Sequence, residues 1–408
     1  MNATEAPNPG APDHVPPGLF WDRSLEAFAR ELDDPFLAAA RLHQGPDIFW
    51  AREAAYGRAG WVITRQGLIQ EAFADPKRFS NLQGSGLSAM LGVNWRLVPL
   101  DCDPPEHTLY RTLLNPHFTP QAVGELDGAI RETCRSLASK FEGRRGCEAI
   151  SEFVAPFPTH LFLALMGMPL DQAPQFLAWE HSLLRGGDAA ERIGAGKAIA
   201  HYLAGFIREQ RTAPRTALLK GLVVARIDGR LLEDEEILGM LYLLYIAGLD
   251  TMQGVMGWIL KHLACDAPLQ ARLRAQPEDI PRAVEELLRA YSVVSTWRCV
   301  AQDLVFHGVQ MRQGDPVLLP LYLAARDPQA HENPHAIDLA RTSGRLGFGA
   351  GPHHCLGAHL VRREMRMVLE TFLSRFDRIH IPPGDACDHH TGVVFGVDRL
   401  PLAWEDIR

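Results

Sequence analysis

The chain has 408 residues, of which 47% are hydrophobic and 22% charged, a composition that excludes a disordered, fibrous or membrane-spanning protein. Its 41 basic and 49 acidic residues give a formal net charge of −8, which argues against a protein that coats nucleic acid or an anionic membrane surface. Seven cysteines are scattered and form no Cys-x-x-Cys pair. That pattern favours a reducing cytoplasm over a disulfide framework, so a cytoplasmic protein is expected.

The predicted elements, in chain order, describe a mainly helical protein with small β-sheets. The first 17 residues hold five prolines and lack the order of a secretory leader, so we expect a mobile tail over 1–17 and one domain over 18–408. A short helix is predicted at 28–42, with strands at 47–50 and 61–64. Residues 106 to about 274 have mostly helical periodicity, with breaks at 116, 120, 156–158, 169 and 186–187. Strands are predicted at 305–309 and 316–319, an irregular segment at 327–346, and a last helix from about 355 to 376.

The most apolar stretch covers residues 238–260 and is long enough to raise the question of a membrane span. Asp250, Thr251 and Gln253 lie near its middle, where a charged side chain in lipid is costly. The better prediction is a buried helix that crosses a water-soluble core.

The most informative motif surrounds Cys355. Residues 348–357 read Phe-Gly-Ala-Gly-Pro-His-His-Cys-Leu-Gly, a tight loop that leads directly into a helical pattern. Cys355 is then expected at a helix N-terminus, where the dipole and free N–H groups stabilise a thiolate, with Gly351 and Gly357 leaving room for a large flat group. This arrangement suits thiolate ligation of haem iron. A buried structural cysteine is the plain alternative, and a zinc site with His353 and His354 is disfavoured because three neighbouring ligands do not easily close a tetrahedron.

The Cys355 loop resembles the haem-binding signature of cytochromes P-450, within which Phe348, Gly349 and Gly357 belong to the cofactor loop and Cys355 is the iron ligand. The resemblance extends from about residue 20 to the end of the chain. It implies a single domain of about a dozen helices with small sheets, and haem b (iron protoporphyrin IX) as the cofactor. The family's long central helix has its counterpart in the segment 247–251, which reads Ala-Gly-Leu-Asp-Thr.

Asp250 and Thr251 are the catalytic candidates that the resemblance implies. In the family this pair delivers protons during oxygen activation, with Thr251 next to the oxygen and Asp250 linked to bulk solvent. Gly248 removes a side chain one turn before Thr251 and leaves room for a diatomic ligand. The alternative is that Thr251 bonds to its own helix and Asp250 pairs with an arginine elsewhere in the chain.

Further positions match the family motif by motif. Glu286 and Arg289 form a Glu-x-x-Arg motif, which implies a structural, buried ion pair. His107 and Arg111, one turn apart, are expected to bind a haem propionate, and Arg298 and His353 match two further propionate contacts. For each of these four residues a solvated surface charge is the plain alternative.

The chain most resembles the bacterial camphor and terpenoid hydroxylases of the family. Trp95 stands where the camphor enzyme has a substrate-binding tyrosine, and Leu100 replaces a small polar residue. These differences argue against camphor and favour a related, mostly apolar molecule. By the same register, the predicted pocket residues are Trp95, Leu100, Leu243, Ile246, Ala247, Val294, Val393 and Val394.

The resemblance implies a monooxygenase that hydroxylates a small terpenoid or norisoprenoid with O2. Electrons are expected from a separate [2Fe-2S]-type ferredoxin and its reductase. The ferredoxin would dock near Arg362, Arg363 and Arg366. The alternative is that these arginines form an ordinary charged helix face. Other readings are a peroxide-using peroxygenase, a non-catalytic haem sensor and a haem-free terpene-binding protein. Neither nucleic acid nor membrane is an expected partner.

Overall fold

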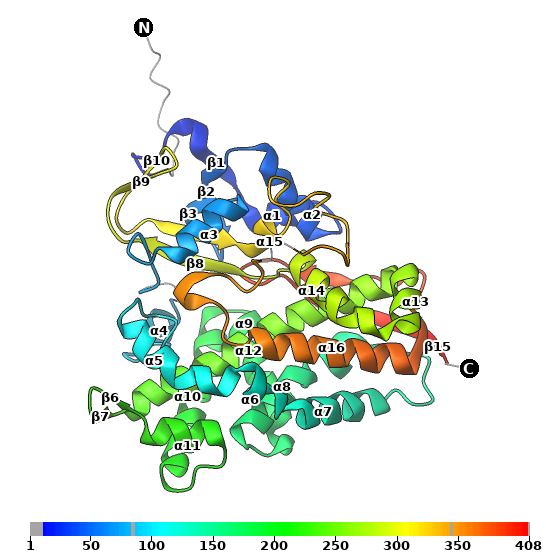
Figure 1. Cartoon of the computed structure of the whole chain (residues 1–408). Coiled ribbons are helices and arrows are strands. Elements are labelled where there is room, and N and C mark those ends of the chain that lie inside the picture. Colours follow the sequence, from blue (N-terminus) through cyan, green and yellow to red (C-terminus); the bar gives the residue numbers. More distant parts are fainter. Residues whose placement is uncertain (1–10, 83–85, 343–345, 407–408) are drawn as a thin grey trace. The chain divides into compact units, whose positions relative to one another are not determined.

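The computed structural model describes residues 11–82, 86–342 and 346–406 (Figure 1). Contacts within the chain group its residues into two compact units. The first unit comprises Met1–Gly84, Glu286–Cys355 and His390–Phe395, and the second comprises Ser85–Glu285, Leu356–His389 and Gly396–Arg408. Each unit therefore gathers segments that are far apart in the sequence.

The first unit is built on a six-stranded sheet. Its strands, in spatial order, are β1 (Phe20–Ser24), β2 (Ile48–Ala55), β3 (Arg58–Ile63), β11 (Pro316–Pro320), β8 (Ser295–Val300) and β4 (Phe79–Ser80). Tyr56 and Gly57, both with positive φ, turn β2 back onto β3 as an antiparallel hairpin. β11 then runs parallel to β3 and antiparallel to β8, so early and late parts of the chain share one sheet. Figure 1 shows the blue β2 and β3 in the same sheet as β8, which comes from a later, yellow-green part of the chain.

The helices of the first unit are short. They are α1 (Leu25–Ala29), α2 (Pro35–Ala40), α3 (Gln66–Ala74) and α15 (Leu321–Ala324), with 3₁₀ turns at Pro17–Leu19, Arg41–Gln44 and Gly351–His353. The continuous helix predicted at 28–42 is wrong, because Asp34 precedes a proline and is extended there. Its carboxylate accepts from the amides of Phe36 and Leu37, so a second helix begins after it.

The strand predicted at 305–309 is also wrong as one element. β9 (Leu304–Phe306) and β10 (Val309–Met311) form an antiparallel hairpin instead. His307 and Gly308, both with positive φ, make its two-residue turn. The predicted strands at 47–50, 61–64 and 316–319 are present and correspond to β2, β3 and β11.

The first unit buries its apolar side chains around the sheet. Trp61, Ile63 and Val317 are fully buried in this core, and the Trp61 indole donates to Asp315 at 2.9 Å. His14 lies 2.7 Å from the same carboxylate, and Val15 is buried. The described part of the predicted tail therefore contacts this sheet, while residues 1–10 lie outside the described residues and the domain boundary at residue 17 stays a prediction.

The second unit is helical, as predicted for residues 106–274. Its helices are α4 (Leu87–Leu91), α5 (Glu106–Leu114), α6 (Pro120–Gly124), α7 (Asp127–Ser139), α8 (Pro156–Met166), α9 (Ala173–Arg185), α10 (Ala189–Thr212), α11 (Ala217–Val224), α12 (Asp234–Cys265), α13 (Ala267–Ala275) and α16 (Ala358–Arg375). α14 (Ile280–Ala290) contributes residues to both units. Pro120 and Pro156 begin α6 and α8, where a missing N–H costs nothing, and Gly186 ends α9.

Small sheets complete the second unit. β12 (Phe376–His380), β15 (Pro401–Asp406) and β5 (Gly146–Glu148) form a three-stranded sheet, and two-stranded pairs join β6 (Arg226–Ile227) to β7 (Arg230–Leu231) and β13 (Asp388–His390) to β14 (Gly396–Arg399). α16 packs along α7, as Figure 1 shows. The mainly helical fold with small sheets agrees with the prediction.

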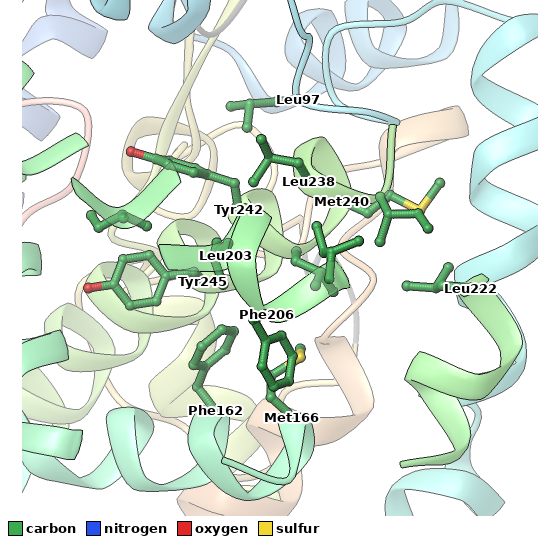
Figure 2. Packing of buried hydrophobic residues seen from close by; sticks show 14 of the residues in the cluster. Leu97, Phe162, Met166, Leu203, Phe206, Leu222, Leu238, Met240, Tyr242 and Tyr245 are labelled. Carbon is green, nitrogen blue, oxygen red and sulfur yellow. The ribbon is translucent and has the colours of Figure 1, made fainter. Parts of the chain in front are cut away.

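The core of the second unit is organised by α12. A capping box between Glu233 and Glu236 starts this helix, and its 32 residues span about 48 Å. Figure 2 shows its Tyr242 and Tyr245 among side chains from α8 and α10, such as Phe162 and Leu203. By length and composition α12 could cross a membrane, but 61% of its most apolar 18-residue window is buried inside the protein. This burial supports the predicted core helix.

Candidate active site

The loop before Cys355 closes on itself through its backbone. The Cys355 amide donates to the carbonyl oxygen of Phe348 at 2.9 Å, and the His354 amide donates to Gly351 at 3.1 Å. Gly349 and Gly351 have φ of 69° and 68°, a conformation that glycine adopts without strain. The two ends of the Phe-to-Cys motif thus lie against each other, and the Cys355 side chain is half-buried.

Gly351 has a packing role in addition to the predicted one. A Cβ atom there would lie 2.3 Å from the carbonyl oxygen of Phe73, at the end of α3. The close approach of α3, which positions the loop, therefore already requires a glycine at this position. Gly349 has more space, since its nearest neighbour would be the Phe73 ring at 3.8 Å.

α16 begins later than the sequence suggested. Gly357 is its N-cap and accepts from the Val361 amide at 2.9 Å, so helical residues start at Ala358, three positions after Cys355. The thiol therefore precedes the helix by a short turn instead of occupying its first position.

Two of the predicted propionate contacts lie in the first unit, close to this loop. The Arg298 guanidinium, on β8, stacks 5.0 Å above the centre of the Phe73 ring, and it donates to the Trp297 carbonyl at 2.8 Å. The His353 imidazole lies 3.3 Å from the Asn81 amide nitrogen. Since Phe73 contacts both Arg298 and Gly351, the first unit brings Arg298, His353 and the Cys355 loop together.

The other two predicted propionate contacts lie on α5 in the second unit. His107 is buried, and Arg111, one turn later, donates to Asn115 at 2.8 Å. Burial, followed by the nearby Arg111 charge, holds the pKa of His107 below its ordinary value. A neutral His107 beside a permanently charged Arg111 gives this helix two N–H donors of the kind that bind carboxylates.

The middle of α12 carries a solvent-accessible strip on an otherwise buried helix. Ala247 and Gly248 are exposed there and Thr251 is half-buried, although Tyr245 and Leu249 on the same helix are almost fully buried. A Cβ atom on Gly248 would have no neighbour within 4 Å. The predicted pocket residues Leu243 and Ile246 border the same strip and are also half-buried. The strip is apolar except for the Thr251 hydroxyl.

Asp250 and Thr251 bind partners in different directions. The Thr251 hydroxyl donates to the Ala247 carbonyl one turn earlier, at 2.7 Å. Asp250 is buried, and its carboxylate accepts from Arg185 of α9 at 2.9 Å. Both alternatives considered for this pair, a back-bonded threonine and an arginine-paired aspartate, are therefore seen. The Thr251 hydroxyl thus stays on its own helix, whereas the Asp250 carboxylate is directed toward α9.

One functional candidate that the sequence did not reveal lies next to Asp250. Glu180, on α9, is only 4% exposed, and the Gln253 side chain of α12 donates to it at 2.8 Å. Burial is the largest cause that raises the pKa of Glu180, to about 8, and the Asp250 charge adds to it. A single glutamate in a helical segment carries no motif, so the only available signal was the polar Gln253 inside an apolar helix.

The remaining pocket candidates are divided between the units. Trp95 is buried in the second unit with its ring 5.2 Å from that of Tyr242, and Leu100 packs against the same core. In the first unit Val294 pairs with Val394, and the Val393 carbonyl accepts from the Ser295 amide at 2.7 Å. The first unit thus contains three of the pocket candidates, Val294, Val393 and Val394, and the second unit contains the other five.

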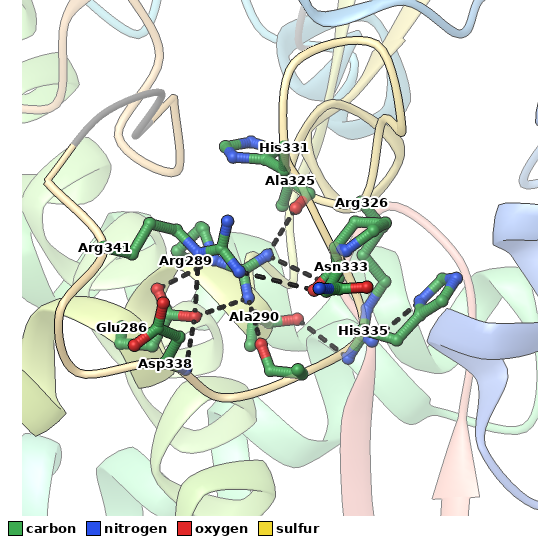
Figure 3. Close-up of polar contacts among 12 residues, drawn as sticks. Glu286, Arg289, Ala290, Ala325, Arg326, His331, Asn333, His335, Asp338 and Arg341 are labelled. Atoms are coloured by element: carbon green, nitrogen blue, oxygen red, sulfur yellow. Dashed lines mark hydrogen bonds and ion pairs between the residues drawn. The ribbon is translucent and has the colours of Figure 1, made fainter.

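Glu286 and Arg289 anchor the segment that precedes the Cys355 loop. Both side chains are fully buried, and they form a two-pronged ion pair with distances of 2.8 and 2.9 Å. Arg289 also donates to the carbonyl oxygens of Ala325 and Pro334, while Glu286 accepts from Arg341 at 3.1 Å. Figure 3 shows how this pair holds residues 325–341, which otherwise lack regular structure.

The three arginines considered for partner docking already have carboxylate partners within the second unit. Arg362 pairs with Glu285 at 2.6 Å, Arg363 with Asp127 at 2.7 Å, and Arg366 with Glu370 at 2.7 Å. These contacts are those of an ordinary charged helix face. Among the residues that the structure describes, no three His, Cys, Asp or Glu side chains gather as a metal site, which leaves the zinc alternative without support.

Comparisons with known proteins agree with this geometry. The family model for cytochrome P450 matches residues 175–403. The chain is 36% identical over 401 residues to the probable cytochrome P450 127A1 of Sinorhizobium fredii, covering 96% of each chain. Two solved structures are similar at 28% identity: CYP101C1, with a TM-score of 0.88 over 97% of this chain and 100% of that one, and CYP101J2, with 0.86 over 97% and 99%.

A sequence identity of 36% over almost the entire chain shows membership of the same family as well as the same fold. Members of this family carry a haem-thiolate cofactor. The chain belongs to the cytochrome P450 family, and its activity is that of a cytochrome P450 monooxygenase.

Proposed function

We propose that this monooxygenase hydroxylates a small hydrophobic terpenoid or norisoprenoid. The observation that carries this proposal is the accessible strip on α12, where the exposed Ala247 and Gly248 are bordered by Leu243 and Ile246. An apolar surface with a single hydroxyl suits a substrate with little polarity and few hydrogen-bonding groups.

The residues present fit haem b with Cys355 as the iron ligand. In the first unit, Cys355 is a half-buried thiol on a loop that backbone hydrogen bonds close. In the second unit, Gly248 leaves open space beside α12. His107, Arg111, Arg298 and His353 would hold the propionates, since all four side chains carry N–H donors. The haem supplies the oxygen chemistry when bound, and the protein supplies position and protons.

Asp250 and Thr251 would handle the protons. Asp250 connects to the surface through Arg185, which also lies 3.7 Å from the partly exposed Asp398. Thr251 keeps its hydroxyl on the accessible strip, where it can hold a proton near the reacting oxygen. An apolar substrate bound over the strip would exclude water from Thr251.

Electrons would come from a separate [2Fe-2S]-type ferredoxin and its reductase, in a cytoplasmic setting consistent with seven scattered cysteines that form no Cys-x-x-Cys pair. Activity with NADH, ferredoxin and reductase but little with hydrogen peroxide alone is the expected result. Equal activity with peroxide alone would support the peroxygenase alternative. Absence of product both with the NADH, ferredoxin and reductase system and with hydrogen peroxide would support a haem sensor.

The thiolate is tested by Cys355→Ser. The reduced, carbon monoxide-bound protein should lose the red-shifted Soret band of thiolate ligation, because a serine hydroxyl stays protonated and binds iron weakly. Cys299→Ser, which changes a half-buried cysteine elsewhere in the first unit, is the matched control and should keep the band. An unchanged band in the Cys355 variant would contradict the assignment.

The substrate class is tested by titrating monoterpenoids and ionones and recording the spin-state shift, with a steroid and a long-chain fatty acid for comparison. Small terpenoids should give the largest shift. Ala247→Leu should weaken their binding by filling the strip, whereas Ala264→Leu near the end of α12 should not. A shift produced only by the larger or charged molecules would overturn the terpenoid proposal.

A further inference from the structure

Asn81 is a buried polar side chain of the first unit that reaches the Cys355 loop. It directly follows β4 and is only 2% exposed. Its side-chain amide nitrogen lies 3.3 Å from Nδ1 of His353, a residue 272 positions later in the chain. Burying an amide is costly unless it forms hydrogen bonds, so the contact between Asn81 and His353 is one that the folded state must keep.

The chemistry of the two atoms fixes the direction of this hydrogen bond. A side-chain amide nitrogen carries only donor hydrogens, so Nδ1 of His353 is the acceptor. The neutral imidazole then carries its single proton on Nε2, the ring nitrogen that does not face Asn81. An imidazole without such a neighbour can carry the proton on either nitrogen, whereas Asn81 selects one of the two forms.

The backbone around Asn81 is held on both sides. Before it, β4 pairs with β8, and Ser80 lies opposite Cys299. After it, the Leu82 amide donates to the Ser80 hydroxyl at 3.1 Å, which closes a tight turn around Asn81. The amide group that binds His353 therefore extends from a fixed point of the sheet.

The backbone of His353 is held as well. This residue ends the 3₁₀ turn Gly351–His353, in which the His354 amide donates to the Gly351 carbonyl at 3.1 Å. Gly351 in turn packs against the carbonyl oxygen of Phe73. Rotation of the His353 side chain about its own bonds is the freedom that remains, and the hydrogen bond from Asn81 restricts it.

The same contact joins His353 to the strand that carries Arg298. The antiparallel pairing of β4 with β8, continued by one residue, places Asn81 next to Arg298. Arg298 is 5% exposed and stacks on the Phe73 ring. Asn81 and Phe73 thus each hold one of two N–H groups in the first unit, an imidazole and a guanidinium, of the kind that bind carboxylates.

We propose that Asn81 is a positioning residue of the cofactor site, which holds His353 with its proton on Nε2 so that the ring can donate to a haem propionate alongside Arg298. Asn81 acts through the His353 ring and need not touch the haem itself. The net charge of the ring does not change, because Asn81 only selects which nitrogen carries the proton. This inference rests on the proposed haem monooxygenase and adds a residue to its cofactor site.

The first test observes the ring itself. Nitrogen NMR of the ferrous, carbon monoxide-bound protein with isotopically labelled histidine should show a protonated Nε2 and a bare Nδ1 for His353, with His353→Gln identifying the signals. Asn81→Asp replaces the donor by a carboxylate, which only accepts, and should move the proton to Nδ1. Asn333→Asp, the same exchange at an exposed residue of the first unit, should leave the signals unchanged. A wild type with its proton on Nδ1 would overturn the proposal.

The second test measures how fast haem leaves the protein for an excess of apomyoglobin, and it needs neither substrate nor redox partner. Asn81→Leu, which removes the hydrogen bond, should release haem about tenfold faster than the wild type. Asn81→Leu in a His353→Gln background should release haem no faster than His353→Gln alone. Additive effects of the two changes would show that Asn81 acts by another route, and they would refute positioning through His353.

Failure of this inference is distinguishable from failure of the proposed function. A wild type with a normal thiolate spectrum, whose haem release does not respond to Asn81→Leu, would refute the role of Asn81 alone. A wild type without that spectrum would refute the proposed haem site. The NMR measurement on the wild type requires no change at Asn81, so it decides the proposal even if an Asn81 variant folds poorly.

Discussion

The carbonyl oxygen of Phe73 lies where a side chain on Gly351 would have to begin, 2.3 Å from the Cβ position. The end of α3 therefore fixes the loop that carries Cys355. The thiol is positioned by packing of backbone on backbone, with no side chain of the loop needed for that contact.

Gly351→Ala should therefore destabilise the Cys355 loop. Gly349→Ala has the same left-handed φ but more room, and it should cost about 1–2 kcal/mol of unfolding free energy from backbone strain alone. Gly351→Ala should cost about 1–3 kcal/mol more because of the clash with Phe73. Denaturant unfolding and haem retention measure the difference. Equal losses in the two variants would show that α3 does not constrain the loop.

Thr251→Ala should uncouple oxygen consumption from product formation. The change removes the only hydroxyl on the accessible strip, and product per NADH should fall about tenfold or more while hydrogen peroxide rises. Thr251→Ser keeps a hydroxyl that can bond to the Ala247 carbonyl and should retain most of the coupling. If alanine and serine variants are coupled equally well, Thr251 has only a structural role.

Glu285 and Glu286 offer a matched pair of neighbouring carboxylates. Glu286→Gln should cost about 3–5 kcal/mol of unfolding free energy, because it leaves the fully buried Arg289 without a counter-ion. Glu285→Gln breaks a partly exposed pair with Arg362 and should cost about 0–1 kcal/mol. Chemical denaturation of both variants provides the comparison. A small loss for Glu286→Gln would mean that the carbonyl contacts of Arg289 suffice.

The buried Glu364 of α16 predicts a pH dependence of stability. Burial raises its pKa in the folded protein to about 8, above the ordinary value of 4.5. The folded state thus keeps a proton that the unfolded state releases, and this group's contribution to stability is full below about pH 4.5 and is lost as the pH rises toward 8. The slope reaches at most about 1.4 kcal/mol per pH unit.

Glu364→Gln should remove the contribution of Glu364 to that slope. The free energy of unfolding of the variant, relative to that of the wild type, should therefore rise between pH 5 and 8. Glu370→Gln, on the exposed side of the same helix, is the control and should show no such trend. Thermal unfolding across this range measures the effect. A constant difference between Glu364→Gln and wild type would indicate that Glu364 is ionised in the folded protein.

Much of the fold could be predicted because its signals are local. The run of apolar residues around 238–260 identified the core of α12, and the Cys355 motif identified the family. The errors have local causes as well: Asp34 before a proline divided one predicted helix, and the His307-Gly308 turn divided one predicted strand. Hydrophobicity alone did not distinguish these turns from the elements around them.

The site was only partly predictable because its polar contacts join distant segments. Asp250 was identified by its motif, but its partner Arg185 lies 65 residues earlier and Glu180 lies 70 residues earlier in a segment without a motif. Gly351 was identified by its motif, but the packing constraint from Phe73, almost 280 residues away, was not predicted. Such roles follow from three-dimensional packing and leave no trace in residue spacing.

The arginines of α16 carry a consequence for encounters with other proteins. Each of Arg362, Arg363 and Arg366 is already neutralised by a carboxylate of the chain itself. An acidic electron carrier that approaches this helix exchanges one counter-ion for another instead of gaining a new one. If the proposed ferredoxin docks on this helix, its binding should therefore depend only weakly on ionic strength.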